Sequence, residues 1–251
     1  MKKYSYFTGK ENFWVEISDN KMFKLLGSIY ESNPQKEEID PKDYKSNFCI
    51  PFKKNKVIGL AFNYKSMMKK KDNYDEPLIF FKSNTSLISD NNEIEYSKFV
   101  SKIWIEAELC LIIGKEGKNI EEKNAKDYIL GHTCGNDVTA ANIINRDWHL
   151  ARSKALDTFA PIGPYLIKDL KGDDLEIKSS INGNITQKSR TSDRILNDNQ
   201  CISLISKHFT LYPGDIIFTG TPAGATDAVV KSGDIVEIEI EKIGKLKNKV
   251  L

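Results

Sequence analysis

The chain has 251 residues, of which 40% are hydrophobic and 10% aromatic, so it is long enough to form one large domain around a sizeable core. Its 37 basic and 35 acidic residues leave a formal net charge of only +2, which argues against a nucleic-acid-binding or membrane-binding surface. No stretch approaches the roughly 20 consecutive apolar residues of a membrane-spanning helix. These totals predict a globular protein with no nucleic-acid partner and no membrane partner.

Two features indicate the compartment in which the protein works. The N-terminal segment MKKYSYFTGK has no apolar run after its lysines, unlike a secretory signal peptide. The cysteines Cys49, Cys110, Cys134 and Cys201 are far apart and form no C-x-x-C pair, as expected for free thiols in a reducing environment. We therefore expect a cytoplasmic protein.

The first 50 residues indicate a small N-terminal β region followed by a linker. A turn signal at Asp19-Asn20 separates short strands in the first 30 residues. The stretch 31–47 is polar and carries two prolines, which is typical of a linker. We therefore predict a boundary near residue 50, with residues 1–50 as the N-terminal region and residues 51–251 as the main domain.

In the predicted main domain, short apolar strands outnumber helices, and clusters of Gly, Pro, Asn and Asp separate them. Five segments have strand character: 56–62, 77–82, 103–114, 215–220 and 234–243. Three segments have helical character: 121–130, 138–150 and 199–209. No βαβ alternation is long enough for a doubly wound sheet, so we predict an α+β, mainly β domain built as a sandwich or roll.

Glutamates spaced two residues apart occur in three segments, so that in a strand those of each segment would project from one side. Glu237 and Glu239 alternate with apolar residues in IVEIEI, which is the pattern of a strand with one core face and one solvent face. Glu93 and Glu95 lie in the polar stretch SDNNEIEYSK. Surface positions explain both of these pairs.

Glu106 and Glu108 stand in a different context, inside the apolar stretch IWIEAELCLIIG of residues 103–114. The odd positions of this stretch are all apolar, and Trp104 and Cys110 flank the two carboxylates on the even side. Two ionised carboxylates on a desolvated face need a compensating cation, because each unpaired buried charge costs several kcal/mol. Lysines or a divalent metal could supply that charge. A partly exposed strand with surface glutamates is an equal alternative.

A hard cation such as Mg²⁺ needs a further oxygen ligand, and Asp137 is the best candidate in the sequence. It follows a Gly-containing turn in GHTCGNDVTAAN and precedes a stretch with helical character. The same position also suits a helix N-cap, a role in which aspartate is common.

No other motif points to a known chemistry. The chain has no H-E-x-x-H, G-x-S-x-G, Walker A or G-x-G-x-x-G pattern. His132, His149 and His208 are not spaced as metal ligands, and a structural role explains each of them better. The acidic residues therefore carry the functional hypothesis.

Eight blocks of the sequence, taken together, resemble the fumarylacetoacetate hydrolase family and cover nearly all of residues 56–251. The succession of E-x-E, N-D-V, D-T-F-x-P-I-G-P and P-G-D-x-I-x-T-G-T-P is highly specific. The blocks are GLAFNY (59–64), PLIFFKSNTSLI (77–88), IEAELCLIIGK (105–115), GHTCGNDVTA (131–140), KALDTFAPIGPYLI (154–167), NGNITQKSRTSD (182–193), LYPGDIIFTGTPAGA (211–225) and SGDIVEIEIEKIGKLKN (232–248).

The resemblance implies a mixed β-sandwich roll that forms a homodimer and holds Mg²⁺ or Mn²⁺. The metal carboxylates of the family fall on Glu106, Glu108 and Asp137. The resemblance thereby supplies the third ligand and a use for the two carboxylates in the apolar strand.

The resemblance also implies the catalytic residues and the substrate class. An active-site lysine of the family falls on Lys154, the threonine of T-G-T-P falls on Thr221, and Lys82 matches a lysine that faces the site. The family acts on 2-oxo or 1,3-dioxo acids by C–C hydrolysis, decarboxylation or keto–enol isomerisation.

The sequence departs from the family pattern at four positions. Met67 and Lys70 stand where acylpyruvate hydrolases of the family commonly have the His and Glu that activate water. Ala141 and Ile144 stand where the family often has a substrate-binding Arg and Gln. Three nearby residues offer substitutes: Arg146, His149 and Arg152.

Three functional hypotheses follow from these residues. The first is a metal-dependent enzyme that works through an enolate of a 2-oxo acid, as a tautomerase, isomerase or decarboxylase. The second is a C–C hydrolase of acylpyruvate-type substrates that uses a different base. The third is a degenerate member that binds metal or a ligand without turnover.

Overall fold

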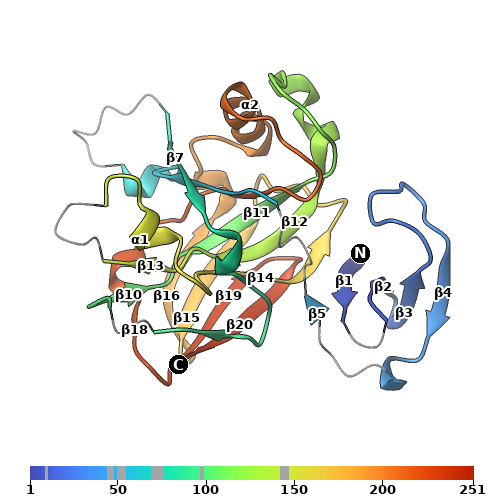
Figure 1. The fold of residues 1–251 in the computed structure, drawn as a ribbon, viewed down its shortest axis with the longest axis horizontal. Coiled ribbons are helices and arrows are strands. Elements are labelled where there is room, and N and C mark those ends of the chain that lie inside the picture. Colours follow the sequence, from blue (N-terminus) through green and yellow to red (C-terminus); the bar gives the residue numbers. More distant parts are fainter. Residues whose placement is uncertain (9–10, 44–47, 50–54, 69–75, 97–98, 142–146) are drawn as a thin grey trace.

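The structure, a computed structural model, describes residues 1–8, 11–43, 48–49, 55–68, 76–96, 99–141 and 147–251. Strands dominate these residues and helices are few (Figure 1). The α-helices are α1 (Ala151–Lys154) and α2 (Asp198–His208). Short 3-10 helices span Pro41–Asp43, Lys65–Met67, Asn84–Ser86, Glu122–Tyr128, Thr191–Asp193 and Ala225–Asp227. The predicted α+β, mainly β class is confirmed.

The described strands form three sheets. The largest has the order β4 (Lys36–Ile39), β3 (Lys21–Leu25), β2 (Phe13–Ser18), β1 (Lys3–Phe7), β14 (Ala160–Ile167), β12 (Ile129–Asn136), β11 (Ala107–Ile113), β17 (Ile216–Phe218), β6 (Val57–Ala61) and β7 (Leu78–Lys82), with β5 (Phe48–Cys49) beside β1 and β8 (Leu87–Ile88) beside β14. The second has the order β16 (Asn184–Arg190), β15 (Glu176–Ile181), β19 (Ile235–Ile240), β20 (Gly244–Val250) and β9 (Glu93–Ile94). The third has the order β13 (Thr139–Ala140), β10 (Ile103–Trp104) and β18 (Val229–Val230).

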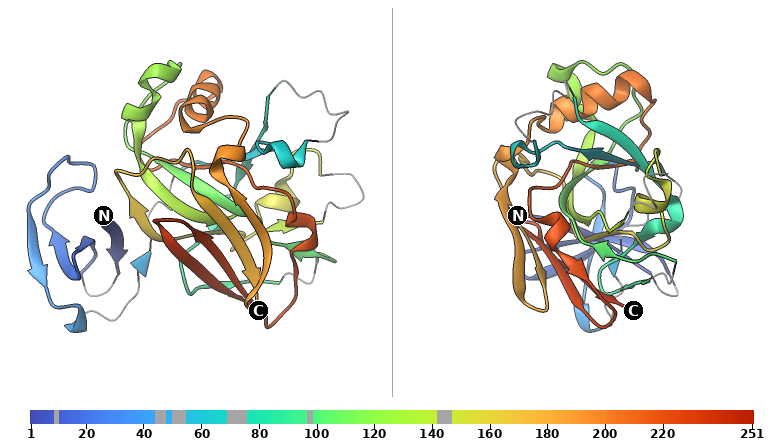
Figure 2. Two further views of the ribbon diagram at one scale, coloured as in Figure 1. Left: turned by 180° about the vertical axis from the view of Figure 1, so that it is seen from behind. Right: turned by 90° about the vertical axis from the view of Figure 1, so that its left-hand side faces the viewer.

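The large sheet and the sheet of β15, β19 and β20 pack against each other to form a sandwich (Figures 1 and 2). Leu109 of β11 and Ile177 and Ile238 of the facing sheet belong to one buried apolar cluster. In β19, Val236 and Ile240 are also buried, whereas Glu237 and Glu239 face outward and Lys245 neutralises them. The predicted core face and solvent face of this strand are confirmed.

Helix α2 covers the opposite face of the large sheet, where Ile202 and Ile205 pack on Leu111 and Ile217. Its N-terminus is a complete capping box, in which the side chain of Asn197 accepts from the Gln200 amide and Gln200 reaches back to the Asn197 amide. The predicted helix at 199–209 is therefore confirmed, and His208 is its last residue.

A buried ionic network ties the start of α2 to the sheet. The Asp198 carboxylate binds Arg194 Nη1 and His132 Nε2, both at 2.8 Å. Burial alone would raise the pKa of Asp198, but the His132 hydrogen bond and the Arg194 charge hold that pKa well below its usual value. His132 thus has a structural position, as predicted.

The N-terminal strands extend the large sheet, because β1 pairs with β14 at Tyr4 and Leu166. The hairpin between β2 and β3 turns at Asp19 and Asn20, both with positive φ, as the turn signal predicted. The linker prediction is wrong for residues 36–39, which form β4. This short charged strand covers the free edge of β3. The domain boundary near residue 50 stays a prediction.

The described parts of the segment 138–150, residues 138–141 and 147–150, do not form the helix that the sequence predicted. Thr139–Ala140 form β13, and the Ala141 N–H donates to the Lys102 carbonyl at 2.9 Å. Val138 and Thr139 are β-branched, which favours this extended backbone. Residues 142–146 lie outside the described ranges, and α1 begins only at Ala151.

Two other elements differ in detail from the prediction. The helix predicted at 121–130 is a 3-10 helix over Glu122–Tyr128, because β12 already begins at Ile129. The strand predicted at 103–114 is interrupted at 105–106, since β10 and β11 belong to different sheets. The interruption places Glu106 between two strands.

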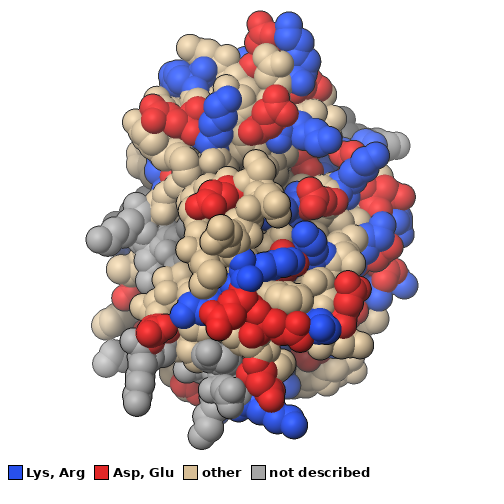
Figure 3. All heavy atoms as spheres, turned by 90° about the vertical axis from the view of Figure 1, so that its right-hand side faces the viewer, with Lys and Arg blue, Asp and Glu red and all other residues tan. Residues whose placement is uncertain are grey.

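The thiols that the structure describes are free, as the sequence predicted. Cys110, Cys134 and Cys201 are buried free thiols; the side chain of Cys49 lies outside the description. Within the described ranges, no helix has the length and apolar character needed to cross a membrane. On the face drawn in Figure 3, basic and acidic side chains lie beside one another, in keeping with the net charge of +2.

Replacing Asp198 by Asn tests the buried network. The substitution leaves the Arg194 guanidinium buried without the Asp198 counter-charge. The free energy of unfolding, measured by urea titration at neutral pH, should therefore fall by about 3–5 kcal/mol. The native pKa of Asp198 is lowered, so its stabilisation is present above the unfolded-state pKa of about 3.9 and is lost as pH falls below it. The deficit of the variant should therefore shrink in acid.

The control for this experiment is Asp127→Asn, which changes an exposed carboxylate. It should alter the free energy of unfolding by no more than about 0.5 kcal/mol. Equal stabilities of Asp198→Asn and the control would contradict the role given to the network.

Candidate functional site

Three buried carboxylates converge at the start of β11 and the end of β12. Glu106, Glu108 and Asp137 each offer an oxygen atom within 4.8 Å of the others, and they are 8%, 1% and 0% exposed. Antiparallel pairing of Ala107 with Asn136 places the two strand ends side by side, and the Asp137 N–H donates to the Glu106 carbonyl at 3.0 Å. The alternative of surface glutamates on a partly exposed strand is therefore wrong. The alternative role of Asp137 as a helix N-cap is also wrong, because strand β13 follows it.

Two lysines from distant parts of the chain neutralise this acidic cluster. Lys154, the last residue of α1, donates to Glu106 Oε2 at 2.9 Å, Asp137 Oδ2 at 2.5 Å and Thr139 Oγ1 at 2.7 Å. Lys82, the last residue of β7, forms a buried ion pair with Asp137 Oδ1. The structure thus brings both sequence-predicted lysines onto the same aspartate.

The pKa shifts in the cluster follow from burial and from these pairs. Burial opposes the ionised form of Asp137, but Lys154 and Lys82 outweigh it and lower the pKa. Burial likewise opposes the charge of Lys154, but Asp137 and Glu106 outweigh it and raise the pKa of the ammonium. For Lys82, burial is the larger effect, and its pKa is lowered despite Asp137.

Glu106 is held in one orientation by donors on its first oxygen. Trp104 Nε1 donates to Glu106 Oε1 at 2.8 Å, and Thr139 Oγ1 donates to the same atom at 2.9 Å. The Glu106 N–H donates in turn to Asn136 Oδ1 at 3.1 Å. The second oxygen, Oε2, is thereby directed to Lys154.

Glu108 has a different environment from its two neighbours. Its Oε2 accepts from the Gly220 N–H at 2.7 Å, and in the described part of the chain no lysine or arginine lies within ion-pair distance of it. Burial, followed by the charges of Asp137 and Glu106, raises its pKa well above the usual value. This carboxylate is the one that lacks a cation.

The loop that binds Glu108 also carries Thr221. Gly220 has a φ of +97°, and a Cβ at this position would lie 2.9 Å from Asn63 Cβ, so only glycine fits the turn. Thr221 follows directly and is 8% exposed. The predicted catalytic threonine is therefore the neighbour of Gly220, whose N–H binds Glu108 of the carboxylate cluster.

Sequence reasoning missed Gln187, which connects this loop with the carboxylate strand. The side chain is 2% exposed and binds both the Ala107 N–H and Thr221 Oγ1, at 2.9 Å each. No signal in the sequence singled it out, because it stands among polar residues in the hairpin strand β16.

The residues of the cluster fit a hard divalent cation. Three carboxylates face two ammonium groups, so one negative charge is left over, and all acidic donors are oxygen atoms, as Mg²⁺ and Mn²⁺ prefer. Glu108 is where the missing positive charge would act. Glu106, Glu108 and Asp137 are the residues that would hold the ion.

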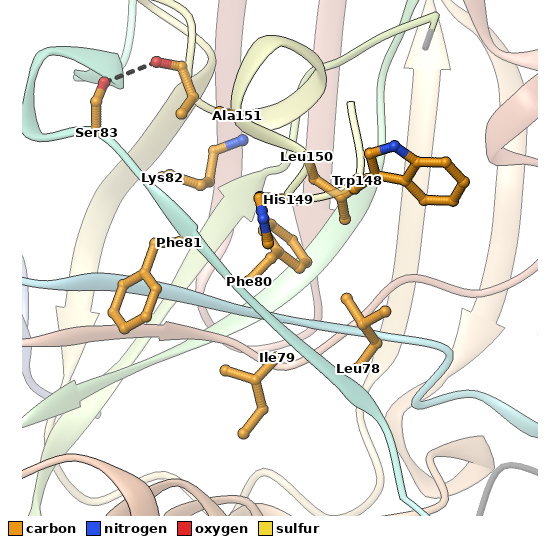
Figure 4. Close-up of a pocket in the computed structure, with 11 residues that line it drawn as sticks. Leu78, Ile79, Phe80, Phe81, Lys82, Ser83, Trp148, His149, Leu150 and Ala151 are labelled. Carbon is orange, nitrogen blue, oxygen red and sulfur yellow. Dashed lines mark hydrogen bonds between the residues drawn. The ribbon is translucent and has the colours of Figure 1, made fainter. Parts of the chain in front are cut away.

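A pocket of about 480 Å³ opens beside Lys82. Figure 4 shows Phe80 and Lys82 on one side of β7, facing the segment from Trp148 to Ala151, whereas Phe81 points the other way. The Phe80 ring also lies 5.1 Å from Lys154 Nζ, so the same strand borders both the pocket and the cluster.

Of the four positions that depart from the family pattern, the structure describes Met67 and Ala141. Met67 is half-buried in the 3-10 helix Lys65–Met67, where Ser66 Oγ accepts from the Ala223 N–H at 3.1 Å. Ala141 is half-buried beside β13. Exposed His149 lines the pocket, and Arg152 is exposed on α1. Three other positions lie outside the described ranges: Lys70, Ile144 and Arg146.

Comparison with known proteins identifies relatives over most of the chain. Residues 56–251 match the family model described as fumarylacetoacetate (FAA) hydrolase C-terminal. The fumarylacetoacetate hydrolase domain-containing protein 2 homolog of Dictyostelium discoideum is 35% identical over 259 residues, which cover 93% of this chain and 82% of the relative. The mitochondrial oxaloacetate tautomerase fahd2 of Xenopus laevis is 36% identical over 191 residues, which cover 70% of this chain and 58% of the relative.

A solved structure extends the similarity over the whole chain. The 5-carboxymethyl-2-hydroxymuconate delta-isomerase of Mycobacterium smegmatis superimposes with a TM-score of 0.88 at 31% identity and covers 100% of this chain and 99% of that chain. The N-terminal strands are therefore part of the shared architecture.

Replacing Glu108 by Gln tests whether this carboxylate lacks a cation. Its raised pKa means that protonated Glu108 favours the fold, so stability present below the unfolded-state pKa of about 4.3 is lost as pH rises toward the native pKa. At pH 8 in EDTA, the variant should therefore unfold at higher urea, with a gain of about 1–3 kcal/mol.

The control is Glu237→Gln, which removes a strand carboxylate paired with Lys245 at the surface. It should change the free energy of unfolding by no more than about 0.5 kcal/mol. A loss of stability in Glu108→Gln would show that the ionised carboxylate is already compensated.

Proposed function

Because the chain belongs to the fumarylacetoacetate hydrolase family, we propose that it is a divalent-metal-dependent enzyme that acts on a 2-oxo or 1,3-dioxo carboxylic acid through an enolate, as a tautomerase, isomerase or decarboxylase. The observation that carries the proposal is the buried cluster of Glu106, Glu108 and Asp137 with Lys82 and Lys154 beside a pocket. Cations in a buried site stabilise the negative charge of an enolate, and the carboxylates of this cluster bind such cations.

A bound Mg²⁺ or Mn²⁺ would act as a Lewis acid that stabilises the negative charge developing on the 2-oxo oxygen. The chain itself supplies a second cation, because Lys154 has three acceptors at 2.5–2.9 Å that fix its ammonium group. Such a fixed charge stabilises a developing oxyanion without reorganisation. Lys82 is buried on the pocket side of β7 and adds positive charge on the other oxygen of Asp137.

Two observations favour tautomerisation or isomerisation over hydrolysis. A hydrolase needs a base that activates water, and the position where hydrolases of the family carry histidine holds half-buried Met67. The relatives described above include an oxaloacetate tautomerase and a delta-isomerase. Both reactions move a proton along an enolate and leave the carbon skeleton intact.

Hydrolysis of a C–C bond is the second candidate function. It is favoured by the position of His149, which lines the pocket together with Lys82. A histidine in this place could accept a proton from water. A binding protein without turnover would keep the metal site and show no reaction.

Removing a carboxylate tests the metal site. Glu106→Ala and Asp137→Ala should each abolish Mn²⁺ binding in calorimetric titrations, because a hard ion loses one of three charged ligands. Asp137→Asn keeps the volume of the side chain and should weaken binding at least about 100-fold, while still satisfying part of the lysine hydrogen bonding.

The matched control is Glu239→Ala, which removes a carboxylate of similar spacing from the exposed face of β19. Its Mn²⁺ affinity should equal that of the parent protein. If the parent protein binds neither Mg²⁺ nor Mn²⁺, the site assignment is wrong.

Product analysis distinguishes the candidate reactions. Incubation of the Mg²⁺-loaded protein with oxaloacetate or with an acylpyruvate, followed by NMR, should show faster keto–enol exchange without cleavage. Pyruvate plus a carboxylic acid from the acylpyruvate would instead mean hydrolysis, and CO₂ plus pyruvate from oxaloacetate would mean decarboxylation. Bound metal with no reaction in either assay would favour the binding protein.

A further inference from the structure

We infer that Gln187 is a positioning residue that commits the Thr221 hydroxyl to donate its hydrogen bond toward the substrate. The inference rests on the proposed function and concerns the side of the site formed by the loop after β17. It depends on which end of the Gln187 amide faces which partner.

The orientation of the amide is fixed by two backbone groups whose roles are unambiguous. The Ala107 N–H can only donate, and it lies 2.9 Å from Gln187 Oε1. The Pro222 carbonyl can only accept, and it lies 2.8 Å from Gln187 Nε2. A flipped amide would place donor against donor and acceptor against acceptor, so the oxygen faces β11 and the nitrogen faces the loop. Ser179 Oγ adds a further donor to Oε1 at 3.0 Å.

This orientation determines the role of Thr221. The second hydrogen of Gln187 Nε2 points to Thr221 Oγ1 at 2.9 Å, so the hydroxyl oxygen accepts there. A threonine hydroxyl carries a single hydrogen, and among the described residues no hydrogen bond is found in which Thr221 donates it. Thr221 is therefore left with its donor available for a ligand.

Gln187 also couples the two halves of the site. Ala107, whose amide it binds, stands between Glu106 and Glu108, and Gly220, which binds Glu108, stands beside Thr221. One buried amide thus sets the spacing between the carboxylates and the threonine donor. Its place is set by β16, where Gln187 pairs with Ser179 of β15 and points inward while Lys188 points to solvent.

A double-mutant cycle tests the coupling. Thr221→Val should lower kcat/KM for oxaloacetate by about 10- to 100-fold, the usual effect of one lost hydrogen bond to a charged group. Gln187→Glu keeps the acceptor for Ala107 but offers no donor when ionised, so the Thr221 hydroxyl must turn toward it. As a single substitution, Gln187→Glu should lower kcat/KM by a similar factor. Added to Thr221→Val, it should lower kcat/KM by less than about threefold.

Two further measurements separate positioning from misfolding. Gln187→Met removes all polar groups at the position and should show the same non-additivity, while Lys188→Met on the exposed side of β16 should behave like the parent protein. Mn²⁺ affinity of both Gln187 variants should stay close to the parent value, because the carboxylate ligands are untouched and only a folded site binds the ion. The urea midpoint of Gln187→Glu should fall, because its buried carboxylate would face the Pro222 carbonyl.

The possible outcomes are distinct. If the decreases in kcat/KM caused by Gln187→Glu and Thr221→Val multiply fully in the double variant, the inference is overturned and the proposed function still stands. A parent protein that neither converts oxaloacetate nor binds oxalate in its Mn²⁺-loaded form would overturn the proposed function, and the inference with it. Non-additivity with intact Mn²⁺ binding supports both.

Discussion

The ion pairs of Asp137 are the interaction on which the centre of this molecule depends. One carboxylate, 0% exposed, binds Lys82 from the edge strand β7 and Lys154 from the end of α1. Burial disfavours the charged form of both ammonium groups, and for each lysine the Asp137 carboxylate is the largest charge that opposes this effect, with Glu106 as the second partner of Lys154. Asp137 thereby joins segments that are 55 and 17 residues away in sequence.

The acidic half of the site could be predicted from the residues themselves. Glu106 and Glu108 differ from Glu237 and Glu239 in their flanking residues, and the structure buries the first pair and leaves the second on a solvent face, with Glu237 half-buried and Glu239 exposed. Asp137 was predicted as a ligand, but the following stretch is a strand and not a helix. Strand pairing with β10 decided that conformation, and local propensity cannot show such a long-range contact.

The remaining residues needed information beyond local pattern. Lys82, Lys154 and Thr221 were located by the resemblance to a family, since nothing in their neighbours distinguishes them from surface lysines and a loop threonine. Gln187 was not located at all, because inward and outward positions of a hairpin strand look alike when both are polar. The break at Glu106 was missed for a related reason: it arises where the chain passes from one sheet to another, which is a property of the tertiary fold.

That passage between sheets has a consequence for the backbone around Glu106. The amides of Glu106 and Ala107 donate to side-chain oxygens of Asn136 and Gln187. Their exchange with deuterium therefore reports the order of two side chains. These two amide protons are a built-in probe of the site, readable by mass spectrometry or NMR before any substrate is known.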